Sequence, residues 1–139
     1  MFDFKNSSNK EGRTTITQED KNLLLKDLCA RLPYGVMIQI PELFYPQRKV
    51  IEKLVTIDDL WHFNDSGIYI ENVKPYLRPM SSITGEEKEE YHKLCDSYYG
   101  IYFDSINSID WLNAHHFDYR GLIPKSLAIE VTKDNNPYG

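Results

Sequence analysis

Residues 110–123 concentrate the side chains of this sequence that are able to do chemistry. The block holds two adjacent histidines, two aspartates, one arginine and three aromatic residues within fourteen positions. A solvated loop rarely needs so many bulky aromatics, and an ordinary core rarely needs so many ionisable groups. We therefore expect the working surface of the protein to include this block.

The two histidines and the aspartate that follows them are candidate metal ligands. Imidazole and carboxylate groups suit zinc, iron or manganese, and His115, His116 and Asp118 supply both kinds. Neighbouring histidines on a helix point about 100° apart, whereas a helical metal pair uses i and i+4 spacing. A metal-dependent hydrolase centred on these three residues is therefore an alternative hypothesis. The simpler interpretation is a helix C-terminal cap for one histidine and packing for the other, with no metal bound.

Acid–base catalysis is a second chemistry that the block allows. Asp110 or Asp118 beside a histidine supplies the proton-transfer groups that such catalysis needs. The sequence has no GxSxG elbow, no reactive-cysteine context and no phosphate-binding glycine loop, and its seven glycines form no GxG pattern. These observations do not decide whether the protein is an enzyme. The sequence favours a protein that is not an enzyme and that carries no cofactor.

Two tyrosine–arginine pairs indicate binding without catalysis. Tyr76 stands near Arg78, and Tyr119 precedes Arg120. An aromatic ring beside a guanidinium group is able to stack a base and to hold a phosphate or ribose through paired hydrogen bonds. Arginines also stack on tyrosines for purely structural reasons in many folds, so each pair taken singly has that simpler explanation.

Two serines extend this candidate binding surface. Ser81 and Ser82 stand at a bend before a predicted helix N-terminus, where hydroxyl and backbone N–H groups are able to donate to an anion. The complete set of predicted ligand-binding residues is Tyr76, Arg78, Ser81, Ser82, His115, His116, Asp118, Tyr119 and Arg120.

Composition limits the class of protein and the kind of partner. The chain of 139 residues is 41% hydrophobic and 27% charged, as expected of one globular domain, and it carries a net charge of −5. An acidic chain is a poor candidate for nucleic-acid binding, which depends on lysine and arginine. The sequence has no membrane-length apolar run and no secretory signal pattern, and Cys29 and Cys95 are expected to be free, buried thiols. We expect a cytoplasmic protein that binds no membrane.

Capping signals predict the helices. Thr17 with Asp20 and Thr84 with Glu87 have the spacing of capping boxes before apolar stripes, and Ser108 is a candidate cap for a third, shorter helix. The predicted helices span about residues 18–32, 85–98 and 109–116.

Runs of β-branched residues predict the strands. Residues 49–57 are rich in such residues, although their charges also allow a helix. Asp58 and Asp59 are typical of turns, so residues 58–70 are interpreted as part of a small antiparallel meander. Pro75 and Pro79 exclude a helix interior from residues 74–82, and they predict extended backbone at Lys74 and Arg78. The predicted strands span residues 36–40, 49–57, 68–70 and 127–131.

These elements predict an α+β fold. We expect a small antiparallel sheet packed by two or three helices, with the proline-containing segment and the histidine block crossing one end. Residues 1–15 are interpreted as a flexible N-terminal arm, residues 16–132 as one globular domain and residues 133–139 as a C-terminal tail.

Three blocks of the sequence carry a resemblance to a known family. They are Leu-Leu-Leu-Lys-Asp-Leu-Cys-Ala-Arg-Leu-Pro-Tyr-Gly at 23–35, Lys-Pro-Tyr-Leu-Arg-Pro-Met-Ser-Ser at 74–82, and the histidine block at 110–123. Together they resemble a family of uncharacterised proteins that is widespread in phages and integrated mobile elements of gut anaerobes. Gly85 departs from the acidic residue expected there. The resemblance implies a setting in the bacterial cytoplasm and no activity, so it assigns no catalytic residue.

The leading hypothesis is a non-catalytic binding protein made by a phage or mobile element. It would sequester a small anionic, nucleotide-like immune signal, as counter-defence sponges do, and because such sponges are commonly oligomers we expect a homo-oligomer. The alternative partner is a host protein, which the chain would bind and inhibit; its acidity would then mimic nucleic acid for a basic surface.

Overall fold

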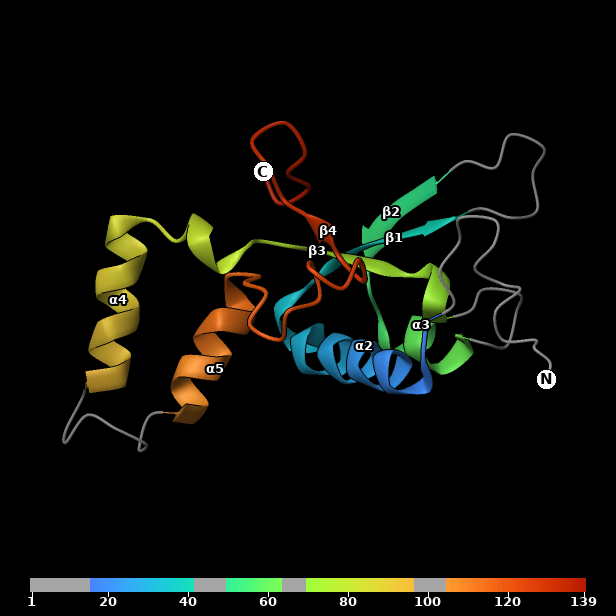
Figure 1. Cartoon of the computed structure of the whole chain (residues 1–139), viewed down its shortest axis with the longest axis horizontal. Coiled ribbons are helices and arrows are strands. Elements are labelled where there is room, and N and C mark those ends of the chain that lie inside the picture. The colour runs from blue at the N-terminus through green and yellow to red at the C-terminus, as the bar shows by residue number, and fades with distance from the viewer. Residues whose placement is uncertain (1–15, 42–49, 64–69, 97–104) are drawn as a thin grey trace.

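A computed structural model describes residues 16–41, 50–63, 70–96 and 105–139. The expected arm at 1–15, most of the expected strand at 68–70 and the side chain of Cys95 lie outside this description. Figure 1 shows the elements, which are α2 (Gln18–Arg31), η1 (Leu32–Tyr34), β1 (Met37–Pro41), β2 (Val50–Leu54), α3 (Ile57–His62), η2 (Ile70–Asn72), β3 (Lys74–Leu77), η3 (Met80–Ser82), α4 (Gly85–Asp96), α5 (Ser105–Ala114) and β4 (Ile129–Glu130).

The four described strands form one mixed sheet in the order β2-β1-β3-β4. Strand β1 runs antiparallel to both β2 and β3, whereas β4 runs parallel to β3. The predicted α+β class is confirmed. The prediction that the sheet is antiparallel is wrong for the last pair, because α4 and α5 lie between β3 and β4 in the chain and provide the long crossover that a parallel pair requires.

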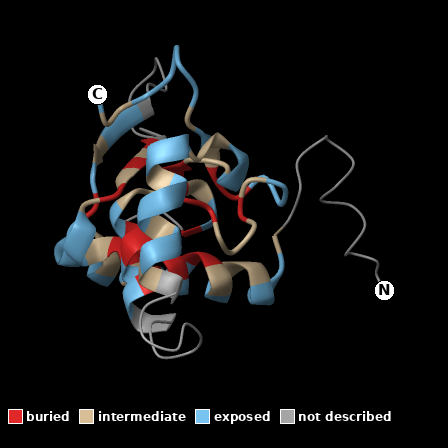
Figure 2. Cartoon of the chain, turned by 90° about the vertical axis from the view of Figure 1, so that its left-hand side faces the viewer, coloured by how far each residue is buried: buried red, intermediate tan, exposed pale blue. Residues whose placement is uncertain are grey.

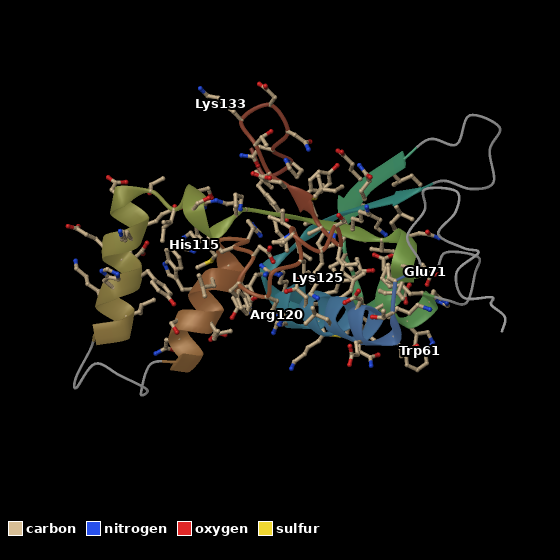
Figure 3. All side chains as sticks on the ribbon, viewed as in Figure 1. Trp61, Glu71, His115, Arg120, Lys125 and Lys133 are labelled. Atoms are coloured by element: carbon tan, nitrogen blue, oxygen red, sulfur yellow. The ribbon has the colours of Figure 1, made fainter. Side chains whose placement is uncertain are left out.

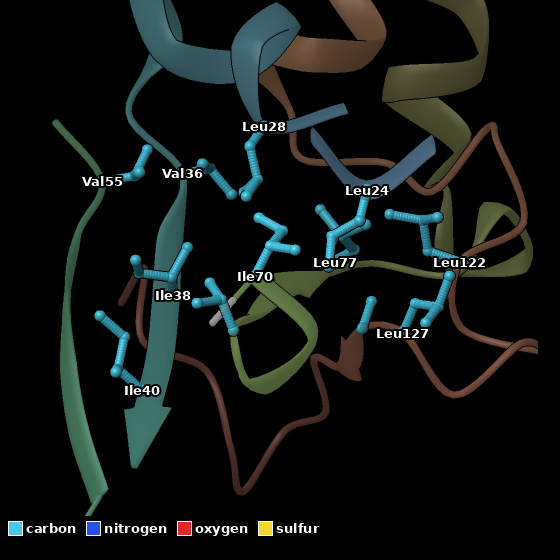
Figure 4. Close-up of a cluster of buried hydrophobic side chains, with 12 residues drawn as sticks. Leu24, Leu28, Val36, Ile38, Ile40, Val55, Ile70, Leu77, Leu122 and Leu127 are labelled. Carbon is cyan, nitrogen blue, oxygen red and sulfur yellow. The ribbon is translucent and has the colours of Figure 1, made fainter. Parts of the chain in front are cut away.

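The main core lies between α2 and one face of the sheet. Leu24 and Leu28 of α2 belong to the same buried cluster as Ile38 of β1 and Leu77 of β3, and none of the four is more than 1% exposed (Figure 4). Leu122 joins them from the last part of the histidine block. Burial of each such side chain stabilises the fold by roughly 1.5–3 kcal/mol before entropy is counted. This packing fixes the position of the block relative to the sheet.

Helix α2 has a narrower apolar stripe than the sequence predicts. Leu25 is 41% exposed and Cys29 is exposed, so the prediction of a buried thiol at Cys29 is wrong. Asp27 and Arg31 are fully buried instead, and the Arg31 Nε donates to the Asp27 carboxylate at 2.7 Å. The interior side of this helix therefore carries an ion pair next to its leucines.

Helix α3 replaces the turn that was predicted at Asp58 and Asp59. The Thr56 hydroxyl accepts from the Asp59 N–H at 3.1 Å, and the Asp59 carboxylate accepts from the Thr56 N–H at 2.8 Å. This reciprocal pair is a capping box, the signal that correctly predicted the starts of α2 and α4 elsewhere. The predicted meander is wrong here, and Ile70 belongs to a short 3-10 turn rather than to a strand.

Helices α4 and α5 lie side by side at one end of the molecule (Figure 1). Their shared cluster contains Trp111, Leu112 and Phe117, with Tyr91 and Leu94 of α4 packed against it. Seen from this end, α4 presents a largely exposed face and the buried residues lie behind it (Figure 2).

Helix α5 begins four residues before the predicted start. The predicted cap, Ser108, is therefore a buried residue inside the helix. None of the helices in the described ranges is long and apolar enough to cross a membrane.

A candidate ligand groove

The two blocks singled out in the sequence lie next to each other in the fold. The Arg78 N–H donates to the His116 carbonyl at 2.7 Å, and the Asp118 N–H donates to the Arg78 carbonyl at 2.8 Å. These bonds form a parallel bridge between Arg78 and Phe117. The proline-containing segment and the histidine block therefore form one continuous surface at the end of β3.

A groove of about 930 Å³ opens on this surface. Three segments line it: the chain from Arg78 to Thr84, the end of α5, and the chain after β4. Five of the nine predicted ligand-binding residues take part, namely Arg78, Ser81, Ser82, His115 and His116. Sequence reasoning missed the lining residues of the third segment, which include Thr132, Lys133, Asn136 and Tyr138.

His116 occupies an unusual backbone position at the end of α5. Its N–H donates to the Asn113 carbonyl at 3.1 Å, and the Phe117 N–H donates to the Leu112 carbonyl at 2.9 Å. This is a Schellman motif, whose left-handed residue is usually glycine. His116 adopts that conformation with φ 65°, which costs a residue with a Cβ roughly 1–2 kcal/mol. The helix terminus alone would be better served by glycine, so the imidazole needs a separate explanation.

The His116 ring forms part of the groove and packs on the C-terminal segment. It stacks on the Tyr138 ring with 3.6 Å between centroids and 10° between planes. The Nδ1 atom is buried and has no hydrogen-bond partner. Burial lowers the pKa of His116 to about 4, and the charges of Arg31, His115 and Arg78 act in the same direction. His116 is therefore a neutral imidazole at physiological pH.

His115 is oriented by the last turn of α5. Its Nδ1 lies 2.9 Å from the Trp111 carbonyl oxygen, and its ring stacks on the Trp111 ring at 4.0 Å between centroids. The ring is half-buried and lines the groove (Figure 3). These two contacts hold the imidazole of His115 in a defined orientation before any ligand arrives.

Tyr138 attaches the C-terminal segment to the sheet. Its hydroxyl accepts from the Met37 N–H at 2.9 Å and donates to the Tyr76 carbonyl at 2.8 Å. Burial raises the pKa of Tyr138 to about 12, so the hydroxyl keeps its proton and its role as donor. Residues 133–139 were predicted to be a polar tail. The only local signal of this contact is one aromatic residue in an otherwise polar stretch.

Arg78 is bound within the protein rather than free to hold an anion. Its two terminal nitrogens donate to the Glu87 carboxylate at 2.9 and 2.8 Å, and its Nε donates to the Ser82 hydroxyl at 3.3 Å. Its guanidinium lies 4.1 Å from the centre of the Phe117 ring. Hydrogen bonding to Arg78 lowers the pKa of Glu87 to about 2. Arg78 therefore stacks on Phe117 and not, as was predicted, on Tyr76. Its guanidinium hydrogen-bond donors are occupied by the Glu87 carboxylate.

Tyr76 belongs to the interior. It is 1% exposed, and its hydroxyl accepts from the Gln39 amide at 3.1 Å and donates to the Glu52 carboxylate. Burial and the bond to Glu52 raise the pKa of Tyr76. Tyr76 does not line the groove. Its contribution to the site is indirect, because its backbone carbonyl is one of the two groups that hold Tyr138.

Tyr119 and Arg120 form the predicted pair, but away from the groove. The Arg120 guanidinium lies 4.7 Å from the centre of the Tyr119 ring and donates to the buried carboxylate of Asp27 at 2.8 Å. Arg31 shares the same carboxylate and donates to the Phe117 carbonyl at 2.6 Å. These cations join α2 to the histidine block, so their contacts are those of structural residues.

Asp118 shapes the last part of the histidine block. Its two carboxylate oxygens accept from the Leu122 N–H at 2.8 Å and the Ile123 N–H at 2.9 Å, and the side chain is buried. No group of three potential ligands suited to a metal occurs among the described residues. His115, His116 and Asp118, the centre of the alternative hydrolase hypothesis, do not form such a group. Each of the three side chains has a different environment.

Comparison with known proteins identified no relative of this chain. No protein-family model, no curated protein and no solved structure matches the chain.

Proposed function

We propose that this protein is a non-catalytic binding protein that holds a small anionic, nucleotide-like ligand in the groove between η3, the end of α5 and the C-terminal segment. The observation that supports this most strongly is the groove itself, which collects five separately predicted residues into a space of about 930 Å³. Binding sites for small molecules usually occupy roughly 300–1,000 Å³.

The lining of the groove favours an anionic ligand with several acceptors. Hydroxyl, amide and ammonium donors come from Ser81, Thr132, Asn136 and Lys133. Glu130 is the acidic residue of the same lining, and Lys133 lies near it in the chain. Lys133 is an exposed residue of the lining and is therefore at the rim of the groove, and its side chain extends outward from the C-terminal segment (Figure 3). The proposal assigns the ligand anion to this rim, because Arg78 is already neutralised by Glu87.

The resemblance to proteins of phages and mobile elements supplies the biological setting of the proposal. A binding protein made during infection would act by sequestering a nucleotide-like immune signal in the bacterial cytoplasm. Sequestration requires tight binding and no turnover. The hydrogen-bond donors that line the groove support such binding and need no catalytic group. The proposal includes a homo-oligomer, as expected of a sponge.

Native mass spectrometry of the purified chain, incubated separately with nucleoside monophosphates and ribose 5-phosphate, tests this proposal. We expect an adduct of fixed stoichiometry that is lost in Lys133→Ala and kept in Lys125→Ala. Lys125 is a matched control because it is half exposed, pairs only loosely with Asp20 at 3.7 Å and lies outside the groove. An intact protein that forms no adduct with any of these probes would contradict the proposal.

A second candidate function is binding and inhibition of a host protein. The observation that favours it is an exposed apolar surface on α3, where Trp61 is 79% and Ile57 is 69% exposed. They are one helical turn apart, and large apolar side chains exposed together often mark protein interfaces. A pull-down from host lysate distinguishes this function: Trp61→Lys should lose a specific partner, and Ile109→Lys, on the distant helix α5, should keep it (Figure 1).

A further inference from the structure

The proton on the His115 ring is fixed by its contact with α5. A carbonyl oxygen only accepts hydrogen bonds, so the Nδ1 that lies 2.9 Å from the Trp111 oxygen must carry the hydrogen. In the neutral ring the other nitrogen, Nε2, then has a free electron pair. His115 accordingly offers the groove a hydrogen-bond acceptor.

His116 has the opposite arrangement. Its Nδ1 is buried without a partner, and a buried N–H with no acceptor is rarer and more costly than a buried lone pair. The nearby positive charge of Arg31 also disfavours additional positive charge on this ring. The hydrogen of the neutral ring therefore belongs on Nε2, and the ring itself lines the groove. His116 accordingly offers a hydrogen-bond donor.

We infer that His115 and His116, held in opposite tautomers, form an acceptor–donor pair that recognises the edge of a nucleobase in the groove. This inference rests on the proposed function and adds the class of ligand. A phosphate or carboxylate anion only accepts and leaves the His115 acceptor unmatched. The Watson–Crick edge of every nucleobase carries at least one donor and one acceptor as neighbours, and proteins that bind an unpaired base read this edge.

The groove also provides polar and cationic groups for the rest of such a ligand. The histidines belong to the end of α5, and Lys133 extends from the C-terminal segment (Figure 3). A base at the histidine pair would direct the sugar along the hydroxyls of Ser81 and Thr132 and the phosphate towards Lys133. The left-handed strain of His116 then has a reason, because glycine would relieve the strain and remove the donor.

Calorimetric titration with AMP, GMP, CMP, UMP and ribose 5-phosphate tests the inference. We expect at least one nucleotide to bind ten times or more tightly than ribose 5-phosphate. His116→Gly should lower that affinity about tenfold, the effect of one hydrogen bond, and leave ribose 5-phosphate binding unchanged. His116→Asn, which tolerates the left-handed backbone and keeps an N–H donor, should recover part of the loss.

Ser126→Gly is the matched control for backbone strain. Ser126 is the other non-glycine residue with positive φ in the described part of the chain, at 63°, and it lies outside the groove. The two substitutions relieve the same kind of strain, so only His116→Gly should change nucleotide binding. Nitrogen-15 NMR of the two imidazoles should also show the hydrogen on Nδ1 in His115 and on Nε2 in His116.

The outcomes separate this inference from the proposed function. Equal affinity for ribose 5-phosphate and for all four nucleotides would overturn base recognition and leave an anion-binding groove. Two histidines in the same tautomer would also overturn it. An intact protein that binds none of these probes would contradict the proposed function and the inference together.

Discussion

Protonation of His116 should couple the stability of the fold to pH. The ring has a pKa of about 4 in the folded protein, because of its burial and the charges around it, against an ordinary value of 6.5 that applies to the unfolded chain. Above pH 6.5 the His116 ring is neutral in both the folded and the unfolded protein, so its protonation does not reduce the free energy of unfolding. As the pH falls from 6.5 towards 4, only the unfolded state gains the proton, so the free energy of unfolding decreases.

The size of this effect follows from the two pKa values. Between pH 7 and pH 5 a fully shielded ring would lose about 2 kcal/mol of stability through this proton alone. The His116 ring is only partly buried, so solvent screening reduces the expected loss to about 1 kcal/mol. Glu87, whose pKa is lowered to about 2, loses its contribution below pH 4.5 and therefore acts in a separate range.

Guanidinium denaturation of the wild-type protein and of His116→Asn, at half-unit steps from pH 7.5 to pH 5, measures the effect. Asparagine tolerates the left-handed backbone and does not titrate, and all other titrating groups are common to both proteins. We expect the difference in unfolding free energy between the two proteins to change by about 1 kcal/mol across this range. Two curves that stay parallel would refute the placement of His116 as a buried neutral ring.

Three further substitutions test individual contacts. Tyr138→Phe removes the hydroxyl that satisfies one backbone group on β1 and one on β3, so it should lower the unfolding free energy by about 1–3 kcal/mol; an unchanged denaturation midpoint would contradict the docked C-terminal segment. Arg78→Ala should destabilise the fold by about 1–2 kcal/mol at pH 7, and Glu87→Gln by less, because the pair is partly exposed; a fully stable Arg78→Ala protein would show that the bridge is unimportant. Trp61→Lys should change stability by less than about 0.5 kcal/mol, since the ring is 79% exposed, and a larger loss by thermal melting would mean that the side chain packs against the fold.

Local signals predicted much of the fold. The capping boxes at Thr17 and Thr84 located two helix starts correctly, and the run of mostly apolar residues at 36–40 located β1. The same signal is present at Thr56, but the two aspartates that follow it are also typical of turns, so the local sequence allows both structures. A capping box supplies partners for the unpaired backbone N–H groups of the first turn, which favours a helix start even in so short a segment.

The site was predicted only where sequence neighbours and spatial neighbours coincide. His115, His116 and Ser82 reach the groove because each lies within one of the two blocks that pair at Arg78. Tyr138 joins them through bonds to backbone groups that are 101 and 62 residues away in the sequence, and no local pattern encodes such a contact. Residue types alone also do not show that the side chains of Arg78 and Arg120 are paired with carboxylates of the same protein.

The buried charges of α2 illustrate the same limit. Asp27 and Arg31 have ordinary helical i, i+4 spacing, which in sequence is typical of an exposed salt bridge. Arg120 and the Phe117 carbonyl, both in the distant histidine block, supply further partners for this buried pair. Removing one of these charged side chains would leave another buried charge unpaired, which destabilises the fold. These residues therefore have a structural role and do not contact the proposed ligand.

The central claim is that the groove at the end of α5 holds the ligand. Its most direct test is two-dimensional amide NMR of the nitrogen-15-labelled protein during titration with the four nucleoside monophosphates. We predict saturable shifts at Ser81, His115, His116 and Lys133, with α2 and α3 unchanged. Saturable shifts confined to α2 and α3, or no shifts at millimolar nucleotide, would contradict the account.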